Sequence, residues 1–323
     1  MMKKICFIGG RGAGAEFSTR VCGPDRLALE LSKRLPKDYT SIRFSFPASF
    51  CSFFTMLKVI KRFNPDIIHG HGSLNMALLL VFLQKCFHKK TILTFTDFKK
   101  NVTQNYKILN KLDQVVVLSL YAAKRLQFHG VRSFKVNVVK YGVEDSFYNA
   151  ANNSKIRKRS RKLVLYYGDA RSERGFHILL KSLKHIKKDI TVLICIRKFL
   201  PGFTPSILNH QKKNVYFLHV KDYPCPIQDI IKSVDVVVLP FIQNTLEPPL
   251  TLMEVSAVGT PLITTDVGGN KEVVAEGTVL LKESNPELLA AAINSHFEKP
   301  VQKGKCTVNS WDETLARFKE IYA

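Results

Sequence analysis

Residues 245–274 read Thr245-Leu-Glu-Pro-Pro-Leu-Thr-Leu-Met-Glu-Val-Ser-Ala-Val-Gly-Thr-Pro-Leu-Ile-Thr-Thr-Asp-Val-Gly-Gly-Asn-Lys-Glu-Val-Val274, and their order indicates how the chain folds. An apolar strand, Val234–Leu239, precedes them. Two prolines then stand directly before an apolar run, so a helix is expected to begin near Leu250. Another apolar strand, Pro261–Thr265, follows the run. Strand, helix and strand in this order form the repeating unit of a parallel sheet.

The start of this helix is a candidate binding site. Backbone amides of a first helical turn point outward from the helix end, and the helix dipole favours an anion there. Glu254 lies about one turn further along the helix. Its carboxylate can accept hydrogen bonds from the two hydroxyls of a ribose. The alternative for Glu254 is an ordinary capping glutamate near a helix start.

Alternation of apolar strands with helical stretches extends over most of the chain and predicts an α/β protein. It breaks at residues 151–162, which are polar and basic without periodicity, as in a linker. A length of 323 residues also suits two domains. We therefore expect two Rossmann-like, doubly wound parallel-sheet domains, over residues 1–150 and 163–305. Residues 306–323 should end in a helix with one buried face, because Ser310 can cap it and its apolar residues share one side.

Positive charge is concentrated in the first half of the chain. Residues 1–160 hold 28 Lys and Arg against 9 Asp and Glu, a net charge of +19, whereas residues 161–323 carry +4. Such a surface suits an anionic partner: a membrane, a phosphorylated acceptor or a nucleic acid. The alternative is a solvated surface without a partner. Nucleic acid is disfavoured because no nucleic-acid-reading motif is recognisable.

Other features narrow the class of protein. The longest apolar runs fall short of the roughly 20 residues of a membrane span, and the N-terminal run reads as a buried strand rather than a signal peptide. The seven cysteines stand singly, which favours a reducing compartment. His69 and His71 have strand spacing and could both be ligands, but no third ligand is near them in sequence, so no metal site is expected.

A second candidate site is the loop Gly168-Asp-Ala-Arg-Ser-Glu-Arg-Gly175. It follows a predicted strand, Leu163–Tyr167, and its two arginines, Arg171 and Arg174, can grip a diphosphate. Solvated loop arginines are the alternative. Because this loop and the helix near Leu250 both follow strand ends, we expect them to form two halves of one anion site.

Taken in order, these motifs resemble the family 4 retaining glycosyltransferases of the GT-B fold. Cys22–Leu31 is similar to the family's glycine-containing entry to its first helix, and Asn64-Pro-Asp-Ile-Ile-His-Gly-His-Gly72 to its histidine-bearing strand. Val138–Asp145 and the terminal Ser-Trp-Asp helix also match. The resemblance implies two Rossmann-like domains facing a central cleft, with a C-terminal helix that crosses back to the first domain.

The resemblance also implies roles for individual residues. Arg174 would neutralise the donor diphosphate, Glu254 would hold the ribose and Glu247 would contact the sugar; these three are the expected catalytic residues. The remaining donor-site residues would be Gly23, Gly168, Arg171, Leu250 and Thr251. The acceptor side would include His69, His71, Thr96 and Asp97. No metal is obligatory and no cofactor is expected in this chemistry.

Three positions depart from the family pattern. Asp169 stands where an arginine is usual, and Arg171 is a candidate to replace it. Glu247 and Glu254 are separated by six residues where the family has seven. Thr96 occupies a position where many members have an active-site histidine. These departures support an alternative reading, a degenerate GT-B protein that binds a sugar nucleotide or a partner without catalysis.

The expected function is retaining transfer of a hexosyl group from a nucleotide-diphosphate sugar to an acceptor. The acceptor would be a carbohydrate or a lipid-linked molecule, such as a surface-glycan precursor. We expect a cytoplasmic protein, peripheral at the cytoplasmic face of the membrane on account of its basic half. Phe50, Phe53, Phe54, Leu57 and Ile60 also recur at helical spacing. We expect that stripe to pack on the sheet.

Overall fold

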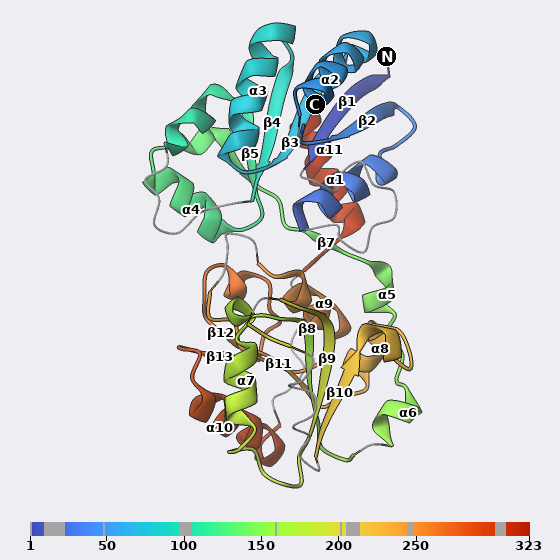
Figure 1. Cartoon of the computed structure of the whole chain (residues 1–323), viewed down its shortest axis with the longest axis vertical. Coiled ribbons are helices and arrows are strands. Elements are labelled where there is room, and N and C mark those ends of the chain that lie inside the picture. Colours follow the sequence, from blue (N-terminus) through green and yellow to red (C-terminus); the bar gives the residue numbers. More distant parts are fainter. Residues whose placement is uncertain are drawn as a thin grey trace. The chain divides into compact units, whose positions relative to one another are not determined.

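The computed structural model describes residues 2–9, 23–47, 49–96, 105–158, 160–200, 202–204, 214–243, 248–300 and 308–323. The chain forms two compact units (Figure 1). One unit holds Met1–Gly142 and Trp311–Ala323, and the other holds Val143–Asn244 and Pro248–Ser310. The chain therefore leaves the first unit before the predicted domain end at residue 150. Short strands lie at the two crossing points, β7 (Gly142–Val143) and β14 (Asn309–Ser310).

The N-terminal unit contains a six-stranded sheet in the order β2-β1-β3-β4-β5-β6. All its neighbouring strands are parallel, and the order reverses beside β1, as in a doubly wound sheet. The strands are β1 (Lys3–Gly9), β2 (Tyr39–Ser45), β3 (Ile67–Gly72), β4 (Lys90–Phe95), β5 (Gln114–Val117) and β6 (Val136–Val138). The helices are α1 (Gly23–Arg34), α2 (Phe50–Phe63), α3 (Leu74–Phe87), α4 (Leu120–Phe128) and α11 (Trp311–Tyr322), with 3₁₀ turns at Tyr106–Lys111 and Ser133–Lys135.

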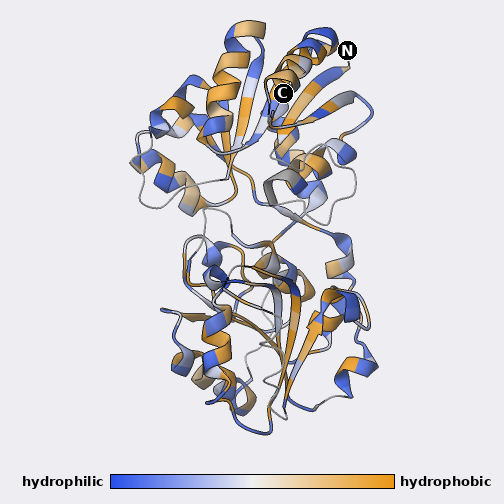
Figure 2. Cartoon of the chain, viewed as in Figure 1, coloured by the Kyte–Doolittle hydropathy of each residue, from blue (hydrophilic) through white to orange (hydrophobic). Residues whose placement is uncertain are grey.

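Helices pack on the two faces of this sheet, because alternate strand residues point to opposite sides. On one face, Ile8 and Ile68 join a core with Met56 and Ile60 of α2. On the other face, the ring of His69 contacts Phe318 of α11. The C-terminal helix therefore returns to the N-terminal unit, as predicted. Figure 2 shows apolar residues running along the strands of both sheets.

The expected packing of the α2 stripe is partly wrong. Ile60 is buried, and Phe53 and Leu57 pack partly against the core, but Phe50 is 79% exposed and Phe54 is 49% exposed. The helix begins at Phe50, after an N-cap at Ser49, and its two exposed phenylalanines lie within its first five residues. No helix of the described residues has the length and apolar character to span a bilayer.

The C-terminal unit repeats the same design. Its parallel sheet has the order β10-β9-β8-β11-β12-β13 and reverses between β8 and β11. The strands are β8 (Leu163–Ala170), β9 (Thr191–Phe199), β10 (Val215–His219), β11 (Val236–Leu239), β12 (Leu262–Thr265) and β13 (Val279–Leu281). The helices are α5 (Asp145–Tyr148), α6 (Ser154–Arg157), α7 (Phe176–Ser182), α8 (Ile227–Lys232), α9 (Leu250–Val258) and α10 (Pro286–Glu298), with 3₁₀ turns at Ser172–Arg174, Val220–Asp222 and Asn270–Glu272.

The segment predicted as a linker lies on the C-terminal unit. The Asn153 amide donates to Ser233 Oγ at 2.6 Å, and Arg157 Nη2 lies 2.7 Å from Asp235 Oδ1. Ile156 of α6 is fully buried. These contacts anchor the described part of residues 151–162 to this unit, so the polar composition there reflects a packed surface segment.

Candidate functional site

The C-terminal sheet places both candidate motifs at one edge. The strand order reverses between β8 and β11, and in such sheets ligands bind outside the carboxyl ends of the strands at the reversal. The arginine loop begins at the end of β8, and ten residues separate the end of β11 at Leu239 from the start of α9 at Leu250. The two motifs therefore occupy the position that a ligand site takes in a doubly wound sheet.

Two glycines shape the arginine loop. Gly168 has φ of +130°, and a Cβ on it would lie 2.5 Å from Arg174 Nη1, so the guanidinium lies directly over the end of β8. Gly175 has φ of +68°, and a Cβ there would lie 1.8 Å from the Pro240 carbonyl oxygen. Only glycine permits both the backbone conformation and this approach. The loop is thereby held against the end of β11.

Arg174 is a partly buried cation whose guanidinium needs an acceptor. Its Nε and Nη1 atoms are buried without a hydrogen-bond partner among the described residues, and Arg171 Nε is in the same condition. The guanidinium carbon of Arg174 lies 5.7 Å from the centre of the Phe241 ring. Burial lowers the pKa of Arg174. A buried donor without a partner is costly, so this arrangement favours an anion that accepts from it.

The residue in the usual arginine position makes an ion pair. Asp169 is 6% exposed, and it accepts from Arg197 Nε at 2.8 Å and from Arg197 Nη2 at 2.9 Å. Burial alone would raise the pKa of Asp169, but the hydrogen bonds and charge of Arg197 lower it. Sequence analysis missed Arg197. Its position at the carboxyl end of β9, the strand beside β8, was the available signal.

Helix α9 presents the second half of the site. Pro249 stands at its N-cap and no side chain caps its first turn, among the described residues. Tyr167 Oη lies 2.7 Å from the Thr251 carbonyl oxygen and 3.0 Å from Glu254 Oε2. Burial, with the charge of Glu254, raises the pKa of Tyr167 well above its usual range, so its hydroxyl stays protonated and donates. Tyr167 is a second residue that the sequence did not identify.

Thr251 Oγ1 is buried and also has no partner among the described residues. The first amides of a helix have no intrahelical acceptor, so Leu250 and Thr251 can offer theirs to a ligand. Gly23 is the first residue of α1 in the other unit. Glu247 and Asp97 lie outside the described residues.

The predicted acceptor-side histidines lie inside the N-terminal unit. His69 Nδ1 lies 2.7 Å from Tyr322 Oη, and His69 Nε2 lies 2.9 Å from Thr94 Oγ1. His71 lies beside it, with 4.2 Å between the ring centres. Neither nitrogen of His71 has a hydrogen-bond partner among the described residues. Thr96 is also buried, and its amide donates to the Gly72 carbonyl at 3.0 Å.

Burial governs the protonation of both histidines. It lowers the pKa of His71 to about 3, and burial together with the His71 charge lowers the pKa of His69 well below its usual range. Both rings are therefore neutral near pH 7. Because both nitrogens of His69 have partners, that ring is fixed in the core, whereas neither nitrogen of His71 is paired within the part of the chain that the structure describes.

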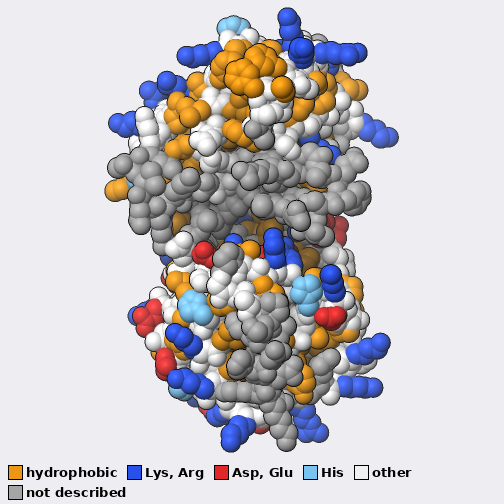
Figure 3. All heavy atoms as spheres, in the orientation of Figure 1, with side chains coloured by type: hydrophobic (Ala, Val, Ile, Leu, Met, Phe, Trp, Pro, Cys, Tyr) orange, Lys and Arg blue, Asp and Glu red, His pale blue; other side chains and the backbone are white. Residues whose placement is uncertain are grey.

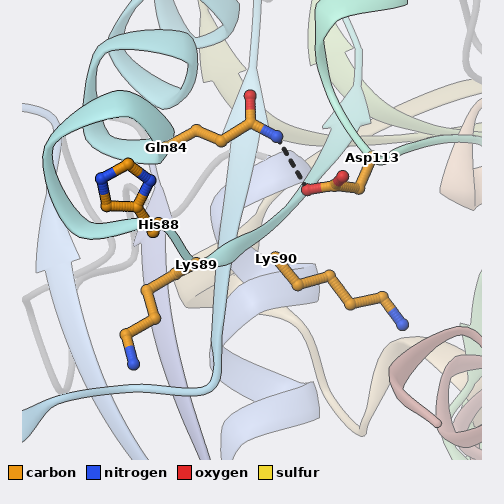
Figure 4. A pocket seen from close by; sticks show the side chains of 5 residues that line it. All are labelled: Gln84, His88, Lys89, Lys90 and Asp113. Atoms are coloured by element: carbon orange, nitrogen blue, oxygen red, sulfur yellow. Dashed lines mark hydrogen bonds between the residues drawn. The ribbon is translucent and has the colours of Figure 1, made fainter.

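Two cavities lie away from these motifs. One, of about 520 Å³, opens at the amino ends of β4 and β5 and is lined by Gln84, His88, Lys89, Lys90 and Asp113. Figure 4 shows Gln84 directed at Asp113, which it meets at 2.9 Å. Asp113 also accepts from the Thr91 amide at 2.7 Å, so this carboxylate supports the fold. The other cavity, of about 640 Å³, lies at the amino ends of β8 and β11.

The chain belongs to the family Glycosyl transferases group 1, which matches residues 149–310. Residues 13–147 match the description Glycosyltransferase Family 4. The family resemblance seen in the motifs is thereby confirmed.

Among curated relatives, D-inositol 3-phosphate glycosyltransferase of Corynebacterium glutamicum is 24% identical over 58% of this chain and 51% of its own length. Spore coat protein SA of Bacillus subtilis is 28% identical over 61% of this chain and 59% of its own. The chain thus spans only about half to three fifths of these relatives. A third relative, the putative teichuronic acid biosynthesis glycosyltransferase TuaC of Bacillus subtilis, is 22% identical over 81% of this chain and 70% of its own length.

Solved structures share the fold over nearly the whole chain. Anabaena HepE, in complex with UDP and glucose, has a TM-score of 0.76 at 15% identity, with 99% of each chain covered. Sucrose-phosphate synthase of Thermosynechococcus elongatus has a TM-score of 0.77 at 17% identity and covers 99% of this chain and 98% of its own. The predicted GT-B fold, with two Rossmann-like parallel-sheet domains, is confirmed.

Proposed function

We propose that this protein transfers a hexosyl group from a nucleoside-diphosphate sugar, held by its C-terminal unit, to an acceptor, with retention of anomeric configuration. The observation that carries the proposal is the Arg174 guanidinium, which lies over Gly168 with two buried nitrogens that have no hydrogen-bond partner among the described residues. It belongs to a chain of the group 1 family. HepE, which shares the fold, has been solved with UDP and with UDP-glucose. A uridine diphosphate sugar is therefore the first donor to test.

The described residues supply what departure of a diphosphate requires. Arg174 would donate its N–H groups to the phosphate oxygens, and the Leu250 and Thr251 amides would donate to the same anion at the start of α9. Glu254 would accept from the ribose hydroxyls while Tyr167 fixes its carboxylate. As the glycosidic bond breaks, the sugar gains oxocarbenium character and the leaving diphosphate gains charge. Fixed positive groups stabilise that charge. These residues need no cofactor for this role.

An acceptor with a phosphate or a lipid-linked phosphate would suit the basic N-terminal half. One relative is named for D-inositol 3-phosphate and another for teichuronic acid biosynthesis. His71, Thr96 and Asp97 remain the proposed acceptor-side residues, together with His69 as the ring that holds His71 in place. The sequence's net charge of +19 over residues 1–160 would attract such acceptors.

The same half carries a surface suited to an anionic membrane, and we place the protein there as a cytoplasmic peripheral protein. The apolar patch consists of Phe50, Phe54, Leu78 and Phe82, all exposed and contributed by α2 and α3. The Phe50 and Phe54 rings lie 5.3 Å apart. Figure 3 shows apolar side chains gathered over the α2 and α3 end of this unit with basic side chains around them.

Charge complementarity selects the occupant of this patch. Lys58, Lys61, Arg62 and Lys85 are exposed on the same two helices. Each basic residue near an anionic bilayer contributes about 1 kcal/mol. Buried aromatic rings add an apolar term of roughly 1.5–3 kcal/mol each. A protein partner would need a face that is both acidic and apolar. An anionic bilayer has negatively charged headgroups above an apolar interior, so it matches both the basic and the apolar side chains of the patch.

The function is tested by donor binding followed by turnover. UDP-, GDP- and ADP-sugars are screened by thermal shift, where a ligand at about 100 times its Kd should add about 2.7 kcal/mol of stability. The donor that binds is then incubated with acceptors, and NMR determines the anomeric configuration of the product. Retention is expected. Binding without release of nucleoside diphosphate would identify the degenerate alternative, and absence of any nucleotide binding would contradict the proposal.

A further inference from the structure

Arg197 is placed at the site by a break in strand register. Along the β8–β9 pair, Gly168 is opposite Ile196, but the next residue, Asp169, is opposite Lys198. Arg197 is therefore the extra residue of a β-bulge. Bulges re-aim a side chain and are common next to active sites. Here the bulge lies at the carboxyl end of β9, the edge where Arg174 is also found.

The Asp169–Arg197 pair is asymmetric in exposure. The Asp169 side chain is 9% exposed and that of Arg197 is 59% exposed. The two hydrogen bonds, at 2.8 and 2.9 Å, hold the guanidinium in a bidentate geometry. A buried carboxylate thus anchors a guanidinium that reaches the solvent side of the site.

Four charged groups meet at this edge. Asp169 interacts electrostatically with Arg197, Arg174 and Arg171. Arg174 also interacts with Arg171 and Arg197. Three guanidinium groups and one carboxylate give the cluster a charge of about +2. A nucleoside diphosphate carries a comparable negative charge. Without Arg197, the unpaired carboxylate of Asp169 would face that diphosphate and repel it.

We propose that Arg197 binds the donor diphosphate in this protein and that Asp169 is the residue that positions it. The inference rests on the proposed function. Position 169 itself carries a carboxylate, and the positive charge beside it is supplied from the bulge of the adjacent strand. Arg171 and Arg174 complete the phosphate-binding set.

The first test compares affinities of wild type and Arg197→Ala for UDP, UMP and uridine by calorimetry. Arg197→Ala should weaken UDP roughly ten- to a hundred-fold, as expected for one charge-assisted interaction. UMP should weaken less and uridine should be unchanged. Lys198→Ala is the matched control, because Lys198 is the next residue of the strand and is exposed. It should bind UDP within about two-fold of wild type.

The second test asks whether Arg197 contacts the ligand or only neutralises Asp169. Asp169→Asn is added to Arg197→Ala, which removes the unpaired carboxylate. UDP affinity should recover in part but stay several-fold below that of wild type. Recovery to within two-fold would show that Arg197 only screens Asp169 and would overturn its role in binding. If the Asp169–Arg197 pair only supported the fold, UDP affinity would not recover at all, because Asp169→Asn restores none of the packing that Arg197→Ala removes. That result would also contradict the proposed role of Arg197.

Folding checks separate a loss of UDP binding from a loss of structure. Each variant is first checked by circular dichroism and thermal unfolding, and Arg197→Gln, which keeps most of the side-chain length, replaces Arg197→Ala if the latter does not fold. UDP binding by Arg197→Ala or Arg197→Gln equal to that of Lys198→Ala would overturn the inference while the proposed function stands. If wild type binds no nucleoside diphosphate, the function itself fails, and the inference with it.

Discussion

Tyr167 Oη lies 3.0 Å from Glu254 Oε2, which joins the carboxyl end of β8 to the second turn of α9. The same hydroxyl lies 2.7 Å from the Thr251 carbonyl oxygen. Since the tyrosine is buried and stays protonated, it donates to these acceptors and holds the Glu254 carboxylate in one orientation. A carboxylate fixed in this way is prepared to accept hydrogen bonds from a ribose.

Glu254→Gln is expected to weaken both UDP and uridine, because the amide offers one acceptor where the carboxylate offers two. The loss should be roughly ten-fold, the effect of one hydrogen bond to a charged group. Calorimetry with both ligands measures it. Glu283→Gln, at an exposed glutamate of the same unit, is the control. Uridine affinity that is unchanged in Glu254→Gln would show that this residue does not hold the ribose.

Glu247 is assigned a different role and gives a separate prediction. If Glu247 contacts the transferred sugar, Glu247→Gln should lower kcat while UDP affinity stays within about two-fold of wild type. Steady-state kinetics with the accepted donor and calorimetry with UDP measure the two effects. Unchanged turnover in Glu247→Gln would show that Glu247 does not contact the transferred sugar.

Strand positions and helix starts could be predicted because local patterns determine them. The prolines before Leu250 place the helix start correctly, and alternating apolar runs place the strands. The pairing of His69 with Tyr322 could not be predicted, since the two residues are 253 positions apart. Nor could the bulge at Arg197, because no residue type in β9 signals a register shift.

The phenylalanines of α2 show a different limit. Helical spacing identifies an apolar stripe but does not say how much of the stripe the sheet can cover. Ile60 is buried, and Phe53 and Leu57 pack partly against the core, whereas Phe50 and Phe54 remain exposed. In the site, sequence order predicted that Arg174 and Glu254 lie at one sheet edge. The hydrogen bonds of Tyr167 to Glu254 and of Arg197 to Asp169 could be seen only in the structure.

The buried histidines predict loss of stability in acid. Their pKa values are lowered in the folded state, so below the ordinary value of about 6.5 the unfolded chain binds protons that the folded chain does not. The free energy of unfolding should therefore fall as pH decreases from about 6.5, by about 1.4 kcal/mol per pH unit for each fully shifted histidine. Stability from this source is fully present above pH 6.5.

His71→Phe should remove about half of that histidine-dependent slope, because the ring volume is kept and the titration is lost. Urea unfolding between pH 7.5 and 4.5 measures it. Fluorescence of Trp311, the single tryptophan, reports on the N-terminal unit, where it is buried. His88→Asn, at an exposed histidine, should keep the wild-type slope. A slope that is the same in wild type and His71→Phe would contradict the assignment.

Membrane docking predicts that Phe50→Ser/Phe54→Ser lowers affinity for anionic vesicles at least ten-fold, since two rings leave the bilayer interface. Co-sedimentation with vesicles of phosphatidylglycerol and phosphatidylcholine measures it. Wild-type binding should need the anionic lipid and weaken as salt rises. Phe128→Ser, at a residue that is 87% exposed on α4, should bind like wild type. Vesicle binding that does not depend on the anionic lipid, or that is unchanged by Phe50→Ser/Phe54→Ser, would contradict the proposal that this surface docks on a membrane.

The central claim is that the Arg174 guanidinium, which has two buried nitrogens without a hydrogen-bond partner among the described residues, binds the donor diphosphate. Its most direct test is the Kd of UDP for wild type and Arg174→Ala, with Arg157→Ala as a control that removes an arginine paired to Asp235 in the same unit. We predict that Arg174→Ala weakens UDP at least ten-fold, as loss of a charge-assisted contact requires, and that Arg157→Ala does not. Equal UDP affinity in wild type and a folded Arg174→Ala would contradict the account.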